Sequence, residues 1–326
     1  MRTETSKKIL EYIKQQKRVS PKQLGEVLDI SNRAIFKQLK NLLDKNEIER
    51  IGSPPKVFYK LVDVSDQEII FNLSNDDMKF LDQFFYWITP LGQVKEGVIG
   101  FSWWCTSRGL PIEKTFIEYK KTIDKYNGYH LENGLISGLG KIRDTFQDVY
   151  LDDLFYVDFY AIERFGKTKV GQILNLAKQN QSLPQINDLI EIIKSNIAIL
   201  VKELKIDCVG FIPPTVKREV QIMNEFKKKL HFNLPVLNIT KIKTPIMVPQ
   251  KTLSKLNDRI ENARNTIVVD DIRVYKNILL IDDAVGSGST INETASHIKD
   301  KNLCSGKLYG LAITGSVKGF EVLSEV

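Results

Sequence analysis

Cysteine, histidine and long apolar runs are scarce in this chain of 326 residues. The three cysteines, Cys105, Cys208 and Cys304, lie too far apart for the close pairs of a zinc site, and the three histidines are isolated. No apolar run reaches the roughly 20 residues of a membrane span. The start of the chain lacks the apolar core of a signal peptide. We therefore expect a cytoplasmic protein with reduced thiols, no Cys–His catalysis and no membrane partner.

Net charge is absent from the chain beyond residue 60. Residues 1–60 carry 14 Lys and Arg against seven Asp and Glu, which accounts for the whole formal net charge of +7. A basic module attached to a neutral body indicates a polyanionic partner for that module.

Residues 1–62 have the pattern of a winged helix-turn-helix. Residues 5–16 show helical spacing, and Ser20-Pro21 is a typical start for a second helix. Ser31 can cap a third helix, for which the predicted buried stripe is Ile35, Leu39 and Leu42. Two short strands, over 48–51 and 57–61, would enclose a wing at 52–56.

This segment resembles winged-helix transcription factors, in which the third helix enters the major groove of DNA. Lys and Arg on such a helix reach phosphates, while Asn and Arg can read base edges. The alternative is a basic winged helix that binds a protein partner. The residues that would bind DNA are Ser31, Asn32, Arg33, Phe36, Lys37 and Lys40.

Residues 63–149 contain few motifs. Aromatic residues gather in 80–88 and 98–105, and 114–126 has helical spacing. Aromatic stripes are typical of a core or a dimer interface. We expect a mainly helical connecting region and a homo-oligomer that holds two winged helices at a fixed separation.

From residue 150 to 326, segments of strand and helix length alternate, which predicts an α/β domain with a parallel sheet. The predicted strands are 151–162, 206–212, 234–239, 277–281 and 307–314, and the predicted helices are 186–204, 217–230 and 291–301.

The strand over 277–281 leads into the segment that carries the chemistry. Ligands bind at the carboxyl ends of strands in open α/β sheets, and the adjacent carboxylates of Asp282 and Asp283 can accept hydrogen bonds from two ribose hydroxyls. The small residues that follow let backbone N–H groups approach a phosphate at a helix start. The predicted phosphate loop is Ala284, Val285, Gly286, Ser287, Gly288, Ser289 and Thr290.

Two other phosphate-binding loops do not fit this segment. A Walker A loop needs a Lys before its Ser or Thr, and a dinucleotide loop needs a third Gly where Ile291 stands. The segment 277–290 instead resembles the motif of type I phosphoribosyltransferases that binds phosphoribosyl pyrophosphate (PRPP). The commonest form of that motif has Thr at the positions of Gly286 and Ser287.

The resemblance extends over residues 150–326. Residues 211–218 follow a strand where these enzymes hold pyrophosphate, and 159–167 is similar to the hood of the ComF branch of the family. ComF proteins often begin with a zinc ribbon of paired cysteines, which this chain lacks. The resemblance implies pyrophosphate contacts from Pro214, Thr215, Lys217 and Arg218, and a ComF-like flexible loop that contains Thr244, Gln250, Arg259 and Asn262.

In this family Mg²⁺ bridges the pyrophosphate and the ribose hydroxyls, and a nitrogen nucleophile displaces pyrophosphate from C1. The resemblance implies that Asp282 and Asp283 hold the hydroxyls and, through water, the metal. Lys241 and Lys243 would neutralise the leaving group.

Three functions remain open at this point. The first is a phosphoribosyltransferase with a DNA-binding module, acting in nucleotide metabolism, competence or mobile-element defence. The second is a transcription regulator that senses PRPP or a nucleotide through the same fold, as purine-operon repressors do. The third is a non-catalytic assembly protein. Nothing in residues 150–185 specifies the acceptor base or amine.

Overall fold

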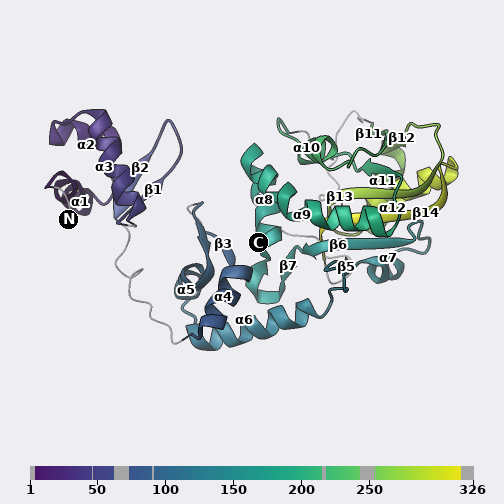
Figure 1. Cartoon of the computed structure of the whole chain (residues 1–326), viewed down its shortest axis with the longest axis horizontal. Helices are drawn as coiled ribbons and strands as arrows, with labels where there is room; N and C mark the ends of the chain where they lie inside the picture. Colours follow the sequence, from purple (N-terminus) through teal and green to yellow (C-terminus); the bar gives the residue numbers. More distant parts are fainter. Residues whose placement is uncertain are drawn as a thin grey trace. The chain divides into compact units, whose positions relative to one another are not determined.

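The computed structural model describes residues 4–45, 47–61, 73–89, 92–214, 218–242, 253 and 255–316 (Figure 1). The chain forms two compact units. The first consists of Met1–Gln83 and Ile88–Leu110, and the second of Phe84–Trp87 and Pro111–Val326. Within the described ranges, no helix is long and apolar enough to cross a bilayer.

The first unit begins with three helices and a strand pair in the order of a winged helix-turn-helix. The elements are α1 (Glu4–Gln16), α2 (Pro21–Leu28), α3 (Asn32–Asp44), β1 (Ile48–Ile51) and β2 (Phe58–Leu61). Strands β1 and β2 are antiparallel, with Ile48 opposite Leu61 and Ile51 opposite Phe58. The residues between them occupy the position of the predicted wing.

Both predicted helix starts are confirmed. The backbone N–H of Gln23 donates to Ser20 Oγ at 3.2 Å, and the N–H of Ser20 donates to Gln23 Oε1 at 2.8 Å. This reciprocal capping box satisfies two donors that a helix start leaves free. Ser31 Oγ likewise accepts from the N–H of Ala34 at 3.4 Å.

The core of this module is the predicted helical stripe. Ile35, Leu39 and Leu42 of α3 are buried against residues of α1 and α2, among them Ile9 and Leu24. Val27, which lies three residues after the buried Leu24 on α2, is 53% exposed. The described part of the connecting region continues with α4 (Asn75–Phe84), the paired strands β3 (Tyr86–Ile88) and β4 (Val94–Glu96), and α5 (Gly97–Thr106).

The second unit is built on a six-stranded sheet with the order β10-β9-β13-β14-β6-β5. Five strands are parallel, and β5 is antiparallel to β6. The strands of this sheet within residues 150–326 are parallel, as predicted, and the antiparallel strand β5 is added from the preceding segment through a connection over residues 138–152 that contains a short helix. The strands are β5 (Ile136–Ser137), β6 (Asp153–Phe159), β9 (Cys208–Phe211), β10 (Val236–Leu237), β13 (Tyr275–Val285) and β14 (Cys304–Gly315).

Helices cover both faces of this sheet (Figure 1). Leu279 and Ile281 of β13 pack in one core with α8 (Lys169–Asn180), α9 (Leu183–Glu203) and α10 (Ile222–Lys229). On the other face α12 (Ser289–Asp300) lies so close that a Cβ built at Gly310 of β14 would be 2.9 Å from Ile291 Cδ1. The domain is thus a layered α/β structure.

Smaller elements complete the second unit. They include the helices α6 (Ile112–Asn127) and α7 (Leu139–Thr145). Strands β7 (Ala161–Ile162) and β8 (Gly166–Lys167) form a pair, with the short helix η2 (Glu163–Phe165) between them. Strands β11 (Ile239–Lys241) and β12 (Ile267–Val269) form another pair, with α11 (Leu256–Thr266) between them in sequence.

Candidate functional site

The predicted phosphate loop is shorter than its sequence indicates. Ala284 and Val285 still belong to β13, where they pair with Thr314 and Gly315 of β14. Ser289 and Thr290 already belong to the first turn of α12. The long ladder between β13 and β14 and the early start of α12 leave a tight turn of Gly286, Ser287 and Gly288.

Asp282 and Asp283 lie at the carboxyl end of β13, as predicted. The N–H of Asp283 donates to Asp282 Oδ1 at 2.7 Å. Burial raises the pKa of Asp282, and the negative charge of Asp283 raises this pKa further. Lys178 of α8 places its Nζ 2.9 Å from Asp283 Oδ1. Asp283 is therefore paired with a lysine that lies far from the motif in sequence.

The turn itself is shaped by Gly288. Its φ is +89°, and a Cβ there would lie 2.1 Å from Ile142 Cδ1 of α7. Only glycine adopts this conformation in this space without strain. Ser287 and Ser289 are buried, and their hydroxyl oxygens are 2.8 Å apart. These two side chains thus bond each other at the start of α12.

A second cation outside the motif contacts the turn from α7. Lys141 Nζ donates to the carbonyl oxygen of Gly286 at 2.5 Å and also bonds Ser316 Oγ at the end of β14. Helix α7 belongs to the segment 63–149, in which the sequence predicts no site residue. Positive charge from this segment therefore lies directly against the predicted phosphate turn.

The chain after β9 runs beside the end of β13. The N–H of Ile212 donates to the carbonyl oxygen of Ile281 at 2.9 Å, and Pro214 follows two residues later. Arg218 lies in the same connection, where its carbonyl oxygen accepts from Gln221 Nε2 at 3.2 Å. Thr215 and Lys217 lie outside the described residues.

The predicted flexible loop is described only at its two ends. Lys241 in β11 and Asn262 in α11 are linked by a contact of 3.5 Å between Nζ and Oδ1, and burial lowers the pKa of Lys241. Arg259 is buried, and its Nε donates to the carbonyl oxygen of Leu253 at 2.7 Å. The described residues do not include Lys243, Thr244 and Gln250.

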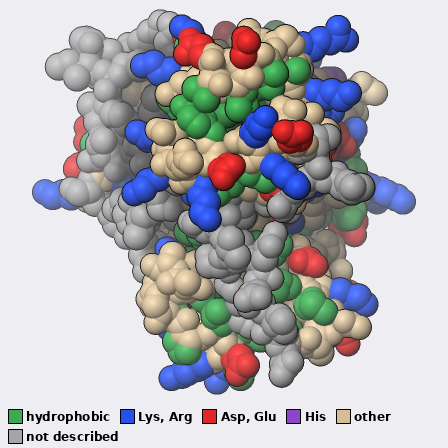
Figure 2. All heavy atoms as spheres, turned by 90° about the vertical axis from the view of Figure 1, so that its left-hand side faces the viewer, with side chains coloured by type: hydrophobic (Ala, Val, Ile, Leu, Met, Phe, Trp, Pro, Cys, Tyr) green, Lys and Arg blue, Asp and Glu red, His purple; other side chains and the backbone are tan. Residues whose placement is uncertain are grey.

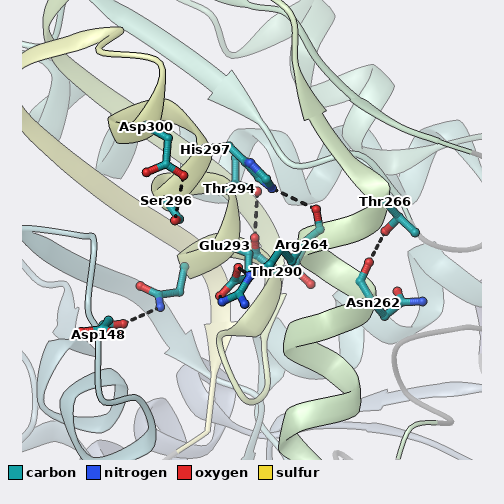
Figure 3. A network of polar contacts seen from close by, with 11 residues as sticks. Asp148, Asn262, Arg264, Thr266, Thr290, Glu293, Thr294, Ser296, His297 and Asp300 are labelled. Carbon is teal, nitrogen blue, oxygen red and sulfur yellow. Dashed lines mark hydrogen bonds and ion pairs between the residues drawn. The ribbon is translucent and has the colours of Figure 1, made fainter.

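A polar network fixes α12 against its neighbours (Figure 3). Arg264 of α11 pairs with the buried Glu293 at 2.9 Å, and its carbonyl oxygen is 3.1 Å from His297 Nε2. Asn292 Nδ2 donates to the carbonyl oxygen of Asp148 at 2.9 Å. The helix that begins at the candidate phosphate turn is thus held by α11 on one side and by the segment before β6 on the other.

Asp158 is a further acid at the same sheet edge. It pairs in register with Thr314, which in turn pairs with Ala284. The N–H of Phe159 donates to Asp158 Oδ1 at 2.7 Å, and burial raises the pKa of Asp158 to about 6. An isolated Asp within an apolar strand gives no signal in the sequence, so this residue was missed.

Asp158 is expected to make stability depend on pH. Its folded pKa of about 6 exceeds its ordinary value of 3.8, so the folded state keeps a proton that the unfolded state loses between these values. The free energy of unfolding should therefore fall as pH rises from about 4 to about 6. In urea titrations across this range, Asp158→Asn should flatten the decrease. An unchanged slope in this variant would contradict the assignment.

All six residues predicted to bind DNA are exposed on α3 or at its cap. They lie opposite the buried stripe, and Phe36 is 53% exposed. Figure 2 views the molecule from the side on which Figure 1 draws the N-terminal helices, and Lys and Arg side chains are spread over this face. The exposed face of α3 thus carries the predicted cations together with Asn32, residue types that DNA-binding helices use.

Comparison with protein families supports the N-terminal module as a DNA-binding one. Residues 2–49 match the family described as Winged helix-turn-helix DNA-binding. No curated protein matches the chain. The N-terminal module is therefore a winged helix-turn-helix of the DNA-binding kind.

Proposed function

We propose that this DNA-binding protein binds PRPP at the carboxyl edge of its sheet and transfers the phosphoribosyl group to a nitrogen acceptor. The observation that carries the proposal is the position of Asp282 and Asp283 on β13, separated by two residues from the turn 286–288 that leads into α12. Carboxylates that can accept from ribose hydroxyls thus precede a helix start that favours a phosphate.

Different parts of the site would bind the 5-phosphate and the pyrophosphate of PRPP. Because Ser287 and Ser289 bond each other, the 5-phosphate would be held by backbone N–H groups of the turn and by Thr290. Lys141 would add positive charge beside the turn. Pro214 and Arg218 lie in the connection after β9, the neighbour of β13, on the side where the pyrophosphate would extend.

Mg²⁺ fits this site only together with the ligand. No group of three or more His, Cys, Asp and Glu able to hold a metal is present in the part of the chain that the structure describes. Mg²⁺ commonly binds through one or two carboxylates together with substrate phosphates. Asp282 and Asp283 would hold it through water, and the ion would neutralise charge on the pyrophosphate as it leaves.

Substitutions at Gly286 can test the role of the phosphate turn without changing the stability of the fold. A Cβ at this position has no heavy atom within 4 Å. Gly286→Thr introduces the hydroxyl that the commonest form of the motif carries, so it should strengthen PRPP binding by about threefold to tenfold, the effect of one added hydrogen bond. Gly286→Val adds a side chain of the same shape as Thr but without the hydroxyl, so it should not strengthen binding. Both variants should have the melting temperature of the wild type. Equal PRPP affinity of the two variants in calorimetry would refute the role of this turn.

The proposed reaction is tested by measuring pyrophosphate release from PRPP and Mg²⁺ with a panel of bases and amines. Release that depends on one acceptor supports transfer. The DNA-binding module favours a second function, a regulator that senses PRPP without turnover. For that function PRPP would bind without pyrophosphate release, and it would change DNA affinity by about 1–3 kcal/mol.

A further inference from the structure

Helix α8 extends along the carboxyl edge of the sheet and is attached near both of its ends. At its start, Thr168 Oγ1 donates to the carbonyl oxygen of Phe159, the last residue of β6, at 2.7 Å. At its end, Gln181 Oε1 accepts from the N–H of Glu219 at 2.8 Å and of Val220 at 3.3 Å, in the connection after β9. The helix therefore links the ends of two strands that are not neighbours.

The length of α8 matches this span. Strands β6 and β9 are three places apart in the sheet, which corresponds to about 14 Å. Twelve residues of α-helix extend over about 18 Å. A Cβ at Gly171 would lie 2.1 Å from the carbonyl oxygen of Tyr160, so the first turn of α8 packs directly on the chain after β6. Side chains of the last turn are consequently held near β13 and β9.

Lys178 belongs to this last turn and forms its ion pair with Asp283 there. The two side chains are 23% and 24% exposed, so a ligand can reach both. The ammonium group comes from the turn that also holds the backbone of residues 219–220. It is thus associated with the β9 side of the carboxylate pair, whereas the turn 286–288 leads away from the pair into α12.

We propose that Lys178 binds the negative charge at the C1 side of the sugar phosphate and makes the site selective for a ribose 5-phosphate that carries a second anionic group at C1. This inference rests on the proposed function. In the free protein Asp283 holds the ammonium group. When ribose hydroxyls donate to Asp283, Lys178 exchanges this carboxylate for a phosphate oxygen at C1, and a charge-assisted contact replaces the one that is lost.

The test compares two ligands in the full-length protein by calorimetry with Mg²⁺. PRPP carries a pyrophosphate at C1, and ribose 5-phosphate has only a hydroxyl there. Lys178→Met should weaken PRPP by about tenfold or more and leave ribose 5-phosphate within about twofold. Lys178→Gln should behave like Lys178→Met, and Lys178→Arg should retain most of the PRPP affinity. The matched control is Lys202→Met, which removes an exposed lysine from the last turn of α9 and should change neither affinity.

The outcomes separate this inference from the function on which it rests. Wild-type protein that binds neither ligand would refute the proposed function and this inference with it. A second outcome is that the wild type binds both ligands while Lys178→Met and Lys178→Gln reduce the two affinities equally or leave both unchanged. In that case the proposed function stands and the role of Lys178 is refuted. Melting temperatures of all variants are measured alongside, and the Lys178→Arg variant supplies the comparison in which the charge is kept.

Discussion

Replacing Asp282 and Asp283 together by Asn should abolish PRPP binding and leave the fold intact. Asn keeps the shape of Asp but loses the charge, so two charge-assisted hydrogen bonds to ribose hydroxyls would be weakened. At about 1.5–3 kcal/mol for each such bond, the affinity should fall by about 100-fold or more. Because burial and Asp283 raise the pKa of Asp282, its replacement relieves an unfavourable charge, which offsets the loss of the ion pair between Asp283 and Lys178. Calorimetry with PRPP and Mg²⁺ measures the effect, and thermal melting checks the fold.

Asp152 and Asp153 provide the matched control for this experiment. They are also adjacent acids in sequence, but they lie at the start of β6, on the opposite edge of the parallel sheet. Asp152→Asn with Asp153→Asn makes the same change in charge, and Asn at 152 can still accept from the N–H of Leu308. PRPP affinity should stay at the wild-type value. Normal PRPP affinity in a folded Asp282→Asn/Asp283→Asn protein would exclude the carboxyl end of β13 as the ribose site.

The second large effect is expected on α3. Arg33→Ala with Lys37→Ala removes two exposed cations one turn apart from the helix that would enter the major groove. Duplex DNA binding by the full chain should weaken by about tenfold or more, and the dependence of log K on log salt should become shallower by about two. Fluorescence anisotropy over a salt series measures both quantities.

Lys8→Ala is the control for the effect of charge alone. Lys8 is an exposed cation of α1 that forms a 3.3 Å pair with Glu4, and it lies outside the predicted recognition helix. Its loss should change DNA affinity much less than the loss of the α3 pair. If the α3 variant is folded and binds DNA like the wild type, α3 is not the recognition helix, and a protein partner becomes the better assignment for the winged helix.

The winged helix-turn-helix could be predicted from the sequence almost completely, because its signals are local. Ser20 and Ser31 cap the helices that follow them within three residues, and the stripe of Ile35, Leu39 and Leu42 is a simple period. Helical spacing alone does not decide burial, as Val27 shows: it lies three residues after the buried Leu24 and is 53% exposed.

The candidate phosphoribosyl site could be predicted only in its local part. The strand, the two acids, the glycine turn and the helix are consecutive in sequence, and they fold as consecutive elements. The extent of the turn was overestimated, since residue types do not reveal that β14 pairs with β13 as far as Val285.

The residues that the sequence did not reveal reach the site from distant elements. Lys141 and Lys178 come from α7 and α8, far from the motif along the chain, and each contacts it only after the sheet is assembled. Ile142, which makes Gly288 necessary, comes from the same helix as Lys141. Surface lysines are common, so neither lysine carried a signal before its partner was known.

The most direct test of the central claim is a calorimetric titration of PRPP with Mg²⁺ into the full-length protein. We predict saturable binding of one PRPP per chain, together with much weaker binding of Mg²⁺ alone, because the described site offers the metal only two carboxylates. Absence of PRPP binding by a folded protein that still binds duplex DNA would contradict the claim that the edge formed by Asp282, Asp283 and the turn 286–288 is a phosphoribosyl site.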